Sequence, residues 1–353
     1  MAVDISKLVS DVKERISLDE LRGKVIAIDA YNTIYQFLSI IRQPNGMPLT
    51  DSKNRVTSHL SGLFYRTISL LEYGAKPIFV FDGMPPALKR KTIEARIARR
   101  QLAMEEWKKA VKEGMTEEAH AYAMASTRIT KEIVDDSKEL LGYMGIPWMQ
   151  ATGEGEAEGA YMTQSGVAYA SASQDYDSFL FGAEVVIRNL TISGKRKLPK
   201  KNVYVDISTE RILLSRLLER YGISRRQLIL IGMLIGTDFN EGIDGVGPMT
   251  ALKIVKGNGS IEEITKYVES KYGKQLDVDP KEVLELFENP EIKEINKEEC
   301  DALMNSAKPS ESKMIRFMCD EHGFSPERIK KFTDKLIALK GSSSQMRIDK
   351  WIK

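Results

Sequence analysis

Three short apolar runs, each closed by an aspartate, constrain the fold of this 353-residue chain more than any other feature of its sequence. The runs lie at 24–29, 76–82 and 167–175, and apolar, small and β-branched residues dominate them. Runs of this length and composition are typical of buried strands. Long helical patterns separate them, so the sequence predicts an α/β fold with a mostly parallel central sheet flanked by helices.

Helical patterns fill most of the remaining chain, including 115–144 and almost all of 209–339. Two further apolar runs, 184–188 and 203–206, resemble a hairpin whose turn carries the basic residues 195–197. We therefore expect the strands to lie in the first two thirds of the chain and a helical region to follow them.

The composition, 42% apolar and 29% charged, is that of a soluble globular protein. It excludes disordered, collagen-like and disulfide-stapled classes, and no run approaches the roughly 18 apolar residues of a membrane span. Residues 1–7 do not resemble a secretory signal, and Cys300 and Cys319 are too few for a disulfide framework. We expect a cytoplasmic, thiol-reduced protein without a membrane partner.

The formal net charge of +2 conceals strong segregation along the chain. Residues 84–112 carry a local balance of +6 and residues 189–226 one of +7, whereas 277–301 carry −7. Two basic blocks in a nearly neutral chain suggest an oriented surface for a polyanion such as nucleic acid. Ordinary charged helix surfaces explain the same pattern equally well.

The aspartates that close the three strands are Asp29, Asp82 and Asp175. In an open α/β sheet, ligands bind in the crevice outside the carboxyl ends of the strands, where these three side chains should meet. Further acids join them: Glu154 and Glu156 at the expected start of a helix, Asp177 two residues after Asp175, and Asp238 after an apolar helix. Such a set suits Mg²⁺, and two ions ~4 Å apart could activate water for phosphodiester hydrolysis. Separate helix caps and surface acids remain an equal alternative.

The loop at 240–252 lies between two apolar helical patterns and contains Gly245, Gly247 and Pro248. The glycines permit close backbone approach, and proline suits the first position of the next helix, whose N–H groups can meet a phosphate. This pattern favours a helix-hairpin-helix element that grips the backbone of duplex DNA, over a plain tight turn.

The segment 89–100 contains six basic residues in twelve. Lys89, Arg96 and Arg100 fall near one helical face. Because the segment directly follows a strand-end aspartate, it could guide a phosphate toward the acids. A solvated surface helix is the alternative.

The last residues follow a Gly-Ser-rich stretch at 341–344, which has the composition of a flexible linker. Gln345, Ile348, Trp351 and Ile352 are spaced to form one anchoring face of a short helical turn. Large apolar groups at a chain end usually seek a partner, although packing on the chain's own domain is the alternative.

Taken in order and spacing, these pieces closely resemble the flap endonucleases of the structure-specific 5′-nuclease superfamily, in their archaeal type. The resemblance covers nearly the whole chain. The motifs that carry it are 28–30, 57–67, 80–83, 154–157, 174–177 and 236–238.

The resemblance implies a two-metal active site, with Mg²⁺ as the cofactor and Mn²⁺ as a substitute. The implied ligands are Asp29, Asp82, Glu154, Glu156, Asp175, Asp177 and Asp238. Lys89 and Arg96 match residues of a helical arch that act on the scissile phosphate. Glu158 lies outside the family's ligand pattern.

The same resemblance assigns contacts to partners. Tyr35 matches a residue that stacks on the nucleotide at the cleavage site, and Arg42 and Thr57 match residues that hold the end of the upstream duplex. The loop from Gly245 to Thr250, which includes Gly247, matches the duplex-binding hairpin, which in the family can hold a monovalent cation, and Lys253 is expected to support its phosphate contacts. The clamp-binding residues Gln345, Ile348, Trp351 and Ile352 imply a PCNA-type sliding clamp.

The implied function is cleavage near the base of a 5′ DNA flap, with 5′→3′ exonuclease activity, by a nucleoid-associated enzyme of DNA replication and repair. A related 5′→3′ exonuclease or excision-repair nuclease is the alternative, and the short spacing from Asp82 to Glu154 opposes the excision-repair nuclease. A non-catalytic DNA- and clamp-binding adaptor is opposed by the complete set of acids. We expect one nuclease domain at about 1–340, with an arch at about 84–130, and a flexible tail at 341–353.

Overall fold

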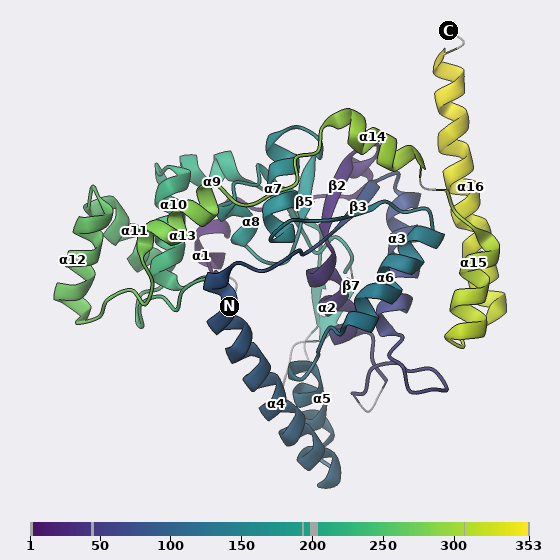
Figure 1. Cartoon of the computed structure of the whole chain (residues 1–353), viewed down its shortest axis with the longest axis horizontal. Coiled ribbons are helices and arrows are strands. Elements are labelled where there is room, and N and C mark those ends of the chain that lie inside the picture. The colour runs from purple at the N-terminus through teal and green to yellow at the C-terminus, as the bar shows by residue number, and fades with distance from the viewer. Residues whose placement is uncertain (1–2, 44–45, 193, 198–203, 307, 352–353) are drawn as a thin grey trace.

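The computed structural model describes residues 3–43, 46–192, 194–197, 204–306 and 308–351. Its centre is a seven-stranded sheet with the strand order β1-β9-β6-β5-β2-β3-β4, and β7 and β8 form a separate pair. Helices cover both faces of the sheet (Figure 1). The strands are β1 (Glu14–Arg15), β2 (Val25–Asp29), β3 (Lys76–Phe81), β4 (Trp148–Gln150), β5 (Ala170–Ala172), β6 (Val185–Arg188), β7 (Gly194–Lys197), β8 (Tyr204–Ile207) and β9 (Glu210–Leu213).

The pairing confirms the predicted mostly parallel sheet. β2 pairs in parallel with both β3 and β5, and β3–β4 and β5–β6 are also parallel, whereas β9 joins β6 and β1 antiparallel. The chain runs from β2 outward to β3 and β4 and then returns to β5 on the other side of β2. The carboxyl ends of β2 and β5 therefore flank a topological switch point, where α/β sheets bind their ligands.

Successive residues of β2 point to opposite faces of the sheet, as in any strand. Ile26 and Ile28 join the core beneath α2 (Ala30–Ile40), α3 (Ser58–Glu72) and α6 (Lys131–Tyr143). Ala27 joins the opposite core, to which α7 and α14 contribute Met162 and Cys300. The helices on this second side are α7 (Gly155–Gln164), α8 (Asp177–Leu180) and α14 (Lys297–Ser306).

A helical lobe extends from one end of the sheet, at the left of Figure 1. Its helices are α9 (Leu214–Tyr221), α10 (Arg225–Ile235), α11 (Pro248–Gly257), α12 (Ile261–Tyr272) and α13 (Pro280–Glu288). The α10 helix is buried along 228–234, and the short N-terminal helix α1 (Ser6–Val9) packs against α11. Because α10 is apolar on all sides, it forms the core of this lobe.

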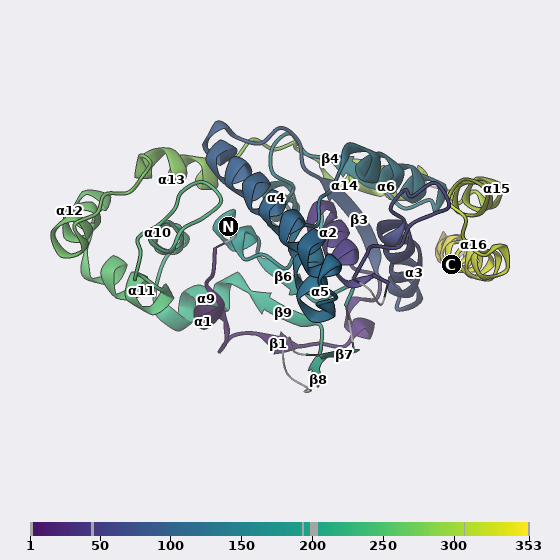
Figure 2. The same cartoon turned by 90° about the horizontal axis from the view of Figure 1, so that it is seen from below.

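A pair of long helices projects from the body and confirms the predicted helical arch (Figures 1 and 2). The pair follows η2 (Ala87–Lys89) and consists of α4 (Arg90–Lys112) and α5 (Thr116–Ala125). The two helices pack mainly on each other, and the buried residues between them include Ala110, Ala119 and Ala123. Small side chains permit this close approach but bury little apolar area.

The C-terminal helices are α15 (Glu311–Ile315), η3 (Arg316–Glu321) and α16 (Pro326–Trp351). The α16 helix packs on α3, where the rings of Phe332 and Tyr65 lie 4.8 Å apart. It continues without a break through 341–351, where the sequence predicted a flexible linker. Glycine and serine weaken a helix without blocking it as proline would. The side chains of the expected clamp-binding residues lie outside the described part of the structure, and so does all of Ile352. Clamp binding therefore stays a prediction.

One predicted pairing was wrong. The basic residues 195–197 lie in β7, which pairs with β8, whereas β6 pairs with β9 rather than with the 203–206 run. The pairing with β9 places Val186 opposite Ile212, and both side chains are fully buried. Burial of this apolar pair explains the choice of partner. A 3₁₀ turn, η1 (Leu18–Leu21), precedes β2.

Across the described residues, every helix falls short of the length and hydrophobicity that crossing a bilayer requires.

Candidate active site

All seven predicted carboxylates lie at the carboxyl edge of the sheet or on the elements beside it. Asp29 ends β2, Asp82 follows β3, and Asp175 follows β5. Glu154 and Glu156 begin α7, Asp177 begins α8, and Asp238 follows α10. Electrostatic interactions connect these groups: Asp82 and Asp175 act on Asp29, Asp177 acts on Glu156, and Asp238 acts on Glu154 and Asp177.

Backbone N–H groups orient two of the carboxylates. The Gly155 N–H donates to Asp82 Oδ1 at 2.7 Å, and the Val3 N–H donates to Asp177 Oδ1 at 2.8 Å. A Cβ atom at position 155 would stand 2.8 Å from the same Asp82 oxygen. The glycine is therefore required, because any side chain there would push into the carboxylate.

Burial and mutual repulsion raise the pKa of most of these acids. The pKa values of Asp29 and Glu156 lie well above the ordinary range. Burial is the largest cause, and repulsion from neighbouring carboxylates is the second. Burial, followed by repulsion from Asp238, raises the pKa of Asp177 to about 7. Desolvation also raises the pKa of Asp175 and Glu154. The cluster therefore has a high affinity for positive charge.

Two cations from the base of the arch supply part of that charge. Lys89 Nζ forms ion pairs with Glu154 and with Asp238 Oδ2, the latter at 3.3 Å, and Arg96 donates to Asp238 Oδ1. Although burial works in the opposite direction, Lys89 and Arg96 together lower the pKa of Asp238. Burial also opposes the charge of Lys89, but Glu154 and Asp238 outweigh it and raise its pKa.

Within the described residues, no three Asp, Glu, His or Cys side chains converge closely enough to hold a metal ion. Lys89 and Arg96 instead occupy oxygens of Glu154 and Asp238. The chemistry of the donor set nevertheless fits a hard divalent cation, because it consists of buried and partly buried carboxylates that outnumber the cations paired with them. Metal ligation by the seven acids stays a prediction.

Tyr35, expected to stack on the nucleotide at the cleavage site, and Arg42 and Thr57, expected at the upstream duplex, lie on α2 and the segment between α2 and α3. Tyr35 projects from α2 and is 38% exposed. Arg42 is held within the protein, because its guanidinium donates to the Ser39 and Gly46 carbonyls at 3.2 and 2.7 Å and to Thr127 Oγ1 beyond α5. Thr57 precedes α3 and is buried. The structure thus links Arg42 to the end of the arch.

The loop before α11 has the predicted local structure. Gly245 has a φ of +82°, Gly247 caps α11, and Pro248 takes the first helical position. A Cβ atom at 245 or 247 would meet no atom within 4 Å, so this side of the loop is open. Lys253 lies one turn into α11 and lines a groove of about 300 Å³ together with Lys271 of α12. Phosphate contact there stays a prediction.

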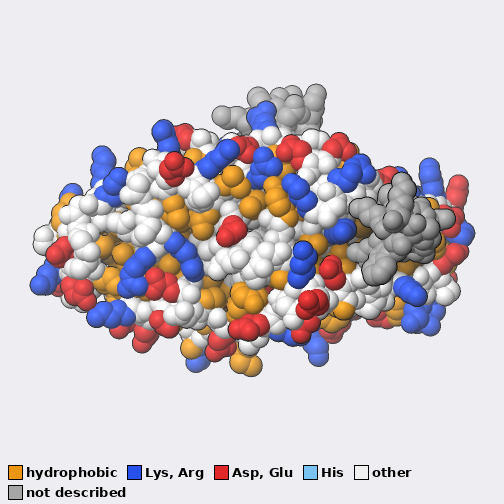
Figure 3. Space-filling model, turned by 90° about the horizontal axis from the view of Figure 1, so that it is seen from above, with side chains coloured by type: hydrophobic (Ala, Val, Ile, Leu, Met, Phe, Trp, Pro, Cys, Tyr) orange, Lys and Arg blue, Asp and Glu red, His pale blue; other side chains and the backbone are white. Residues whose placement is uncertain are grey.

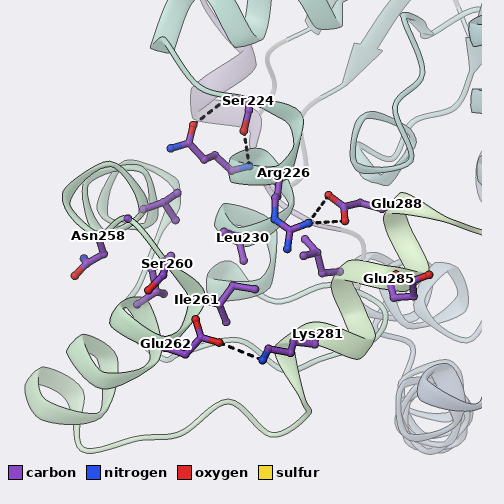
Figure 4. Close-up of a pocket in the computed structure, with 15 residues that line it drawn as sticks. Ser224, Arg226, Leu230, Asn258, Ser260, Ile261, Glu262, Lys281, Glu285 and Glu288 are labelled. Atoms are coloured by element: carbon purple, nitrogen blue, oxygen red, sulfur yellow. Dashed lines mark hydrogen bonds and ion pairs between the residues drawn. The ribbon is translucent and has the colours of Figure 1, made fainter.

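A larger groove of about 660 Å³ lies between α10, α12 and α13 and was not anticipated from the sequence (Figure 4). Two ion pairs cross its lining, Arg226–Glu288 at 2.7 Å and Lys281–Glu262 at 3.1 Å. Its lining carries two basic side chains, Arg226 and Lys281, against three glutamates, so it lacks the excess of positive charge that a DNA backbone would need.

The segregated charges of the sequence are distributed over different elements. The basic block 84–112 forms η2 and α4 of the arch, and the acidic block 277–301 covers α13 and the start of α14. On the face seen in Figure 3, opposite the arch, acidic and basic side chains are interspersed. The arch therefore carries a net positive charge away from this mixed face.

Sequence reasoning missed the polar side chains that support the carboxylates. Ser173 Oγ donates to Glu156 Oε1 at 2.9 Å, Ser178 Oγ donates to the same oxygen at 3.0 Å, and Asn32 Nδ2 donates to Asp175 Oδ2 at 3.1 Å. Each lies within three residues of a predicted ligand, which was the available signal. Glu158, set aside from the ligand set, accepts the backbone N–H of Lys293 instead.

Comparison with known proteins decides the family. The XPG N-terminal domain model matches residues 1–103 and the XPG I-region model matches residues 145–238. Flap endonuclease 1 of Staphylothermus marinus is 46% identical over 99% of both chains, and that of Pyrococcus furiosus is 47% identical over the full length of both. The chain belongs to the flap endonuclease family.

A solved structure of the family supports this assignment. The flap endonuclease of Methanococcus jannaschii is 36% identical, with a TM-score of 0.73 over 97% of this chain and 99% of that one. As a family member, the chain is a structure-specific 5′ flap endonuclease of DNA replication and repair. The match covers nearly the whole chain and therefore includes the sheet, the arch and the helical lobe.

Proposed function

We propose that this flap endonuclease hydrolyses a phosphodiester near the base of a 5′ DNA flap with two Mg²⁺ ions, which Mn²⁺ can replace, and that it also acts as a 5′→3′ exonuclease. The carrying observation is the cluster of seven carboxylates from separate elements, most of them with a raised pKa. Folding alone gains nothing from burying like charges together, so the cluster is best explained by a role in binding cations. The proposed ligands are Asp29, Asp82, Glu154, Glu156, Asp175, Asp177 and Asp238.

Bound ions would supply an activated water and neutralise charge on the leaving oxygen. The protein itself would provide positively charged side chains next to the scissile phosphate and a surface for the neighbouring base. Lys89 and Arg96 reach the carboxylates from the arch, so their N–H donors can meet a scissile phosphate at the same edge. Tyr35, exposed on α2, offers a ring on which the neighbouring base can stack.

Duplex DNA is proposed to lie across two surfaces beside this edge. The open loop at Gly245 and Gly247, with a monovalent cation and Lys253, would hold one duplex by its phosphates. Arg42 and Thr57 would meet the end of the other duplex. Neither surface needs to distinguish bases, which suits an enzyme that selects the shape of its substrate.

The decisive experiment replaces Asp175 or Asp177 by Asn, which removes a charge while keeping the shape. We expect single-turnover cleavage of a double-flap substrate in Mg²⁺ to fall by orders of magnitude. Flap binding without metal should survive, because it depends on phosphate contacts elsewhere. Divalent-ion affinity of the DNA-free protein, measured by calorimetry, should fall in parallel with cleavage. Equal losses of cleavage and DNA binding, with unchanged ion affinity, would contradict the proposed roles.

The tail is proposed to dock on a PCNA-type sliding clamp, with Ile348, Trp351 and Ile352 in one apolar pocket and Gln345 at its edge. The support is the spacing of these residues alone. Aromatic anchors often carry ≥ about 2 kcal/mol of a small interface. Truncation after Gly341 should leave basal flap cleavage intact and abolish stimulation by the clamp. Full stimulation of the truncated enzyme would exclude this docking site.

A further inference from the structure

Asn32 occupies a special position in the first turn of α2. The helix is capped by Asp29, whose Oδ1 accepts the backbone N–H of Asn32 at 2.9 Å. This is an ordinary N-cap, in which a side-chain oxygen satisfies a free N–H of the first turn. Its consequence here is that the backbone of Asn32 fixes the rotation of a proposed metal ligand.

The side chain of Asn32 holds a second proposed ligand. Its Nδ2 donates to Asp175 Oδ2 at 3.1 Å, and its Oδ1 accepts the backbone N–H of Gln174 at 3.2 Å. The orientation of the amide is unambiguous, because a backbone N–H can only donate and an ionised carboxylate can only accept. Asn32 thus joins the end of β2 to the loop after β5, on opposite sides of the switch point.

The bridge opposes an electrostatic strain. Asp175 is one of the neighbours whose negative charge raises the pKa of the buried Asp29, after burial itself and Asp82. Two carboxylates that repel each other would move apart unless something held them. A neutral amide can do this without adding a charge, and its N–H stabilises the ionised form of Asp175.

No other side chain in the described site combines these contacts. Ser173 donates to Glu156 and, at 3.5 Å, to Asp29, and its Oγ accepts the Asp175 N–H at 3.2 Å, but it lies on the same loop as Asp175. Among the described residues, Asn32 alone ties that loop to the α2 helix through both a backbone and a carboxylate partner. Loss of its amide would leave the Gln174 N–H and an Asp175 oxygen unpaired.

We infer that Asn32 is a positioning residue that sets the spacing of Asp29 and Asp175 before divalent cations bind, an inference that rests on the proposed two-metal function. Groups that hydrogen-bond to metal ligands typically contribute 10- to 100-fold to metal affinity. Asn32 touches the ligands rather than the reacting atoms, so its loss should weaken ion binding and spare the rate once ions are saturating.

The test compares Asn32→Leu with a matched control on the same helix. Gln36 lies one turn further along α2, and its side chain accepts a hydrogen bond from Thr191 Oγ1 at 2.7 Å, so Gln36→Leu removes a side-chain bond without touching a carboxylate. Asn32→Ser, a smaller polar change, is the second variant. Mn²⁺ affinity of the DNA-free full chain is measured by calorimetry, and single-turnover flap cleavage is titrated with Mg²⁺.

For Asn32→Leu we expect the Mn²⁺ dissociation constant and the Mg²⁺ concentration for half-maximal cleavage to rise by about tenfold or more, with cleavage largely restored at saturating Mg²⁺. Asn32→Ser should shift both in the same direction, and Gln36→Leu should shift neither. Unchanged ion affinity in both Asn32 variants, or an equal shift in Gln36→Leu, would overturn the inference and leave the proposed function intact. Absence of Mn²⁺ binding by the unaltered chain would instead overturn both.

Discussion

Burial raises the pKa of most acids in the carboxylate cluster at the sheet edge, whereas it lowers the pKa of two histidines in a second group of buried titratable residues. The second group lies between α3, α6 and η3, where His59 Nε2 stands 3.8 Å from Asp136 Oδ2 and His322 Nδ1 stands 3.9 Å from Asp51 Oδ2. Burial, and then the charge of His322, lowers the pKa of His59 to about 3, and burial also lowers that of His322. Both histidines are therefore neutral near pH 7.

The difference shows which buried groups indicate function. The histidines avoid the cost of burying a charge by losing their protons, so they add no uncompensated charge to the protein interior. The carboxylate cluster, in contrast, gathers seven acidic groups, which outnumber the paired cations Lys89 and Arg96. A chain selected for stability alone would not retain such an arrangement, and uncompensated charge of one sign is therefore the better marker of a site.

The largest expected effect comes from removing the arch cations. Replacing Lys89 and Arg96 together by Ala deletes the donors that would meet the scissile phosphate and leaves Glu154 and Asp238 unpaired. Single-turnover cleavage at saturating flap DNA should fall by at least ~100-fold, as for the loss of other transition-state donors.

The matched control replaces Lys108 and Lys109 by Ala, since these residues lie exposed on α4, the helix of Arg96, and carry the same total charge. The control should weaken DNA binding slightly and leave the cleavage rate unchanged. If both double variants lose only affinity, by similar factors, Lys89 and Arg96 act merely as electrostatic guides.

The histidine group predicts a pH dependence of stability. Because the folded pKa of His59 lies below its unfolded value, its contribution is complete above about pH 6.5 and is lost as the pH falls toward 3. Relative to His59→Leu, the unaltered protein should lose about 2 kcal/mol of unfolding free energy between pH 7 and pH 5. Urea unfolding at the two pH values measures this difference.

Neighbouring acids act in the opposite direction and must be considered. Burial raises the pKa of Asp136 to about 6, with Glu132 adding to it, so its ionisation costs stability as the pH rises through 6. His322, Arg55 and Asp51 also face this group. Comparing two proteins that share all these residues isolates His59. An equal loss in both would show that His59 is not the sensitive group.

The carboxylate cluster predicts a stabilising substitution. Asp177→Asn removes one of the repelling charges and keeps the oxygen that accepts the Val3 N–H. In EDTA the variant should gain about 1 kcal/mol, as stabilising changes at functional sites commonly do. Thermal unfolding checks this, with Asp135→Asn on the exposed side of α6 as the control. A less stable Asp177→Asn protein would show that repulsion in the cluster is already relieved.

The smallest effect concerns an exposed cation outside both groups. Lys253 lies on the surface of α11, so its charge matters only when DNA is bound. Lys253→Ala should reduce flap affinity several-fold and lower the slope of affinity against salt by about 1, without changing the rate at saturating DNA. Lys331→Ala on α16 is the control. A change in rate would place Lys253 closer to the chemistry than its position in the fold indicates.

Local patterns were sufficient for the sheet and for the carboxylates. Strand-end aspartates could be located because apolar runs define strands, and parallel strands bring their carboxyl ends to one edge. The same reasoning failed around residues 195–197, because the sequence pattern alone could not show that β6 pairs with β9 and that β8 pairs with β7. It also failed for 341–344. The Gly-Ser composition shows that helix formation is unfavourable there, but it does not show whether the preceding helix continues through the segment.

The sequence by itself determined the order of strands and helices, the positions of the seven acids and the basic arch, because backbone preferences and hydrophobic periodicity are local. Only the tertiary structure decided which side chains meet. It placed His59 beside His322, Lys89 against Glu154, and Asn32 against Asp175, partners that lie 143 residues apart in the last case. Such pairs depend on how buried surfaces pack and on where charge can be compensated, and neither is encoded within a short window of sequence.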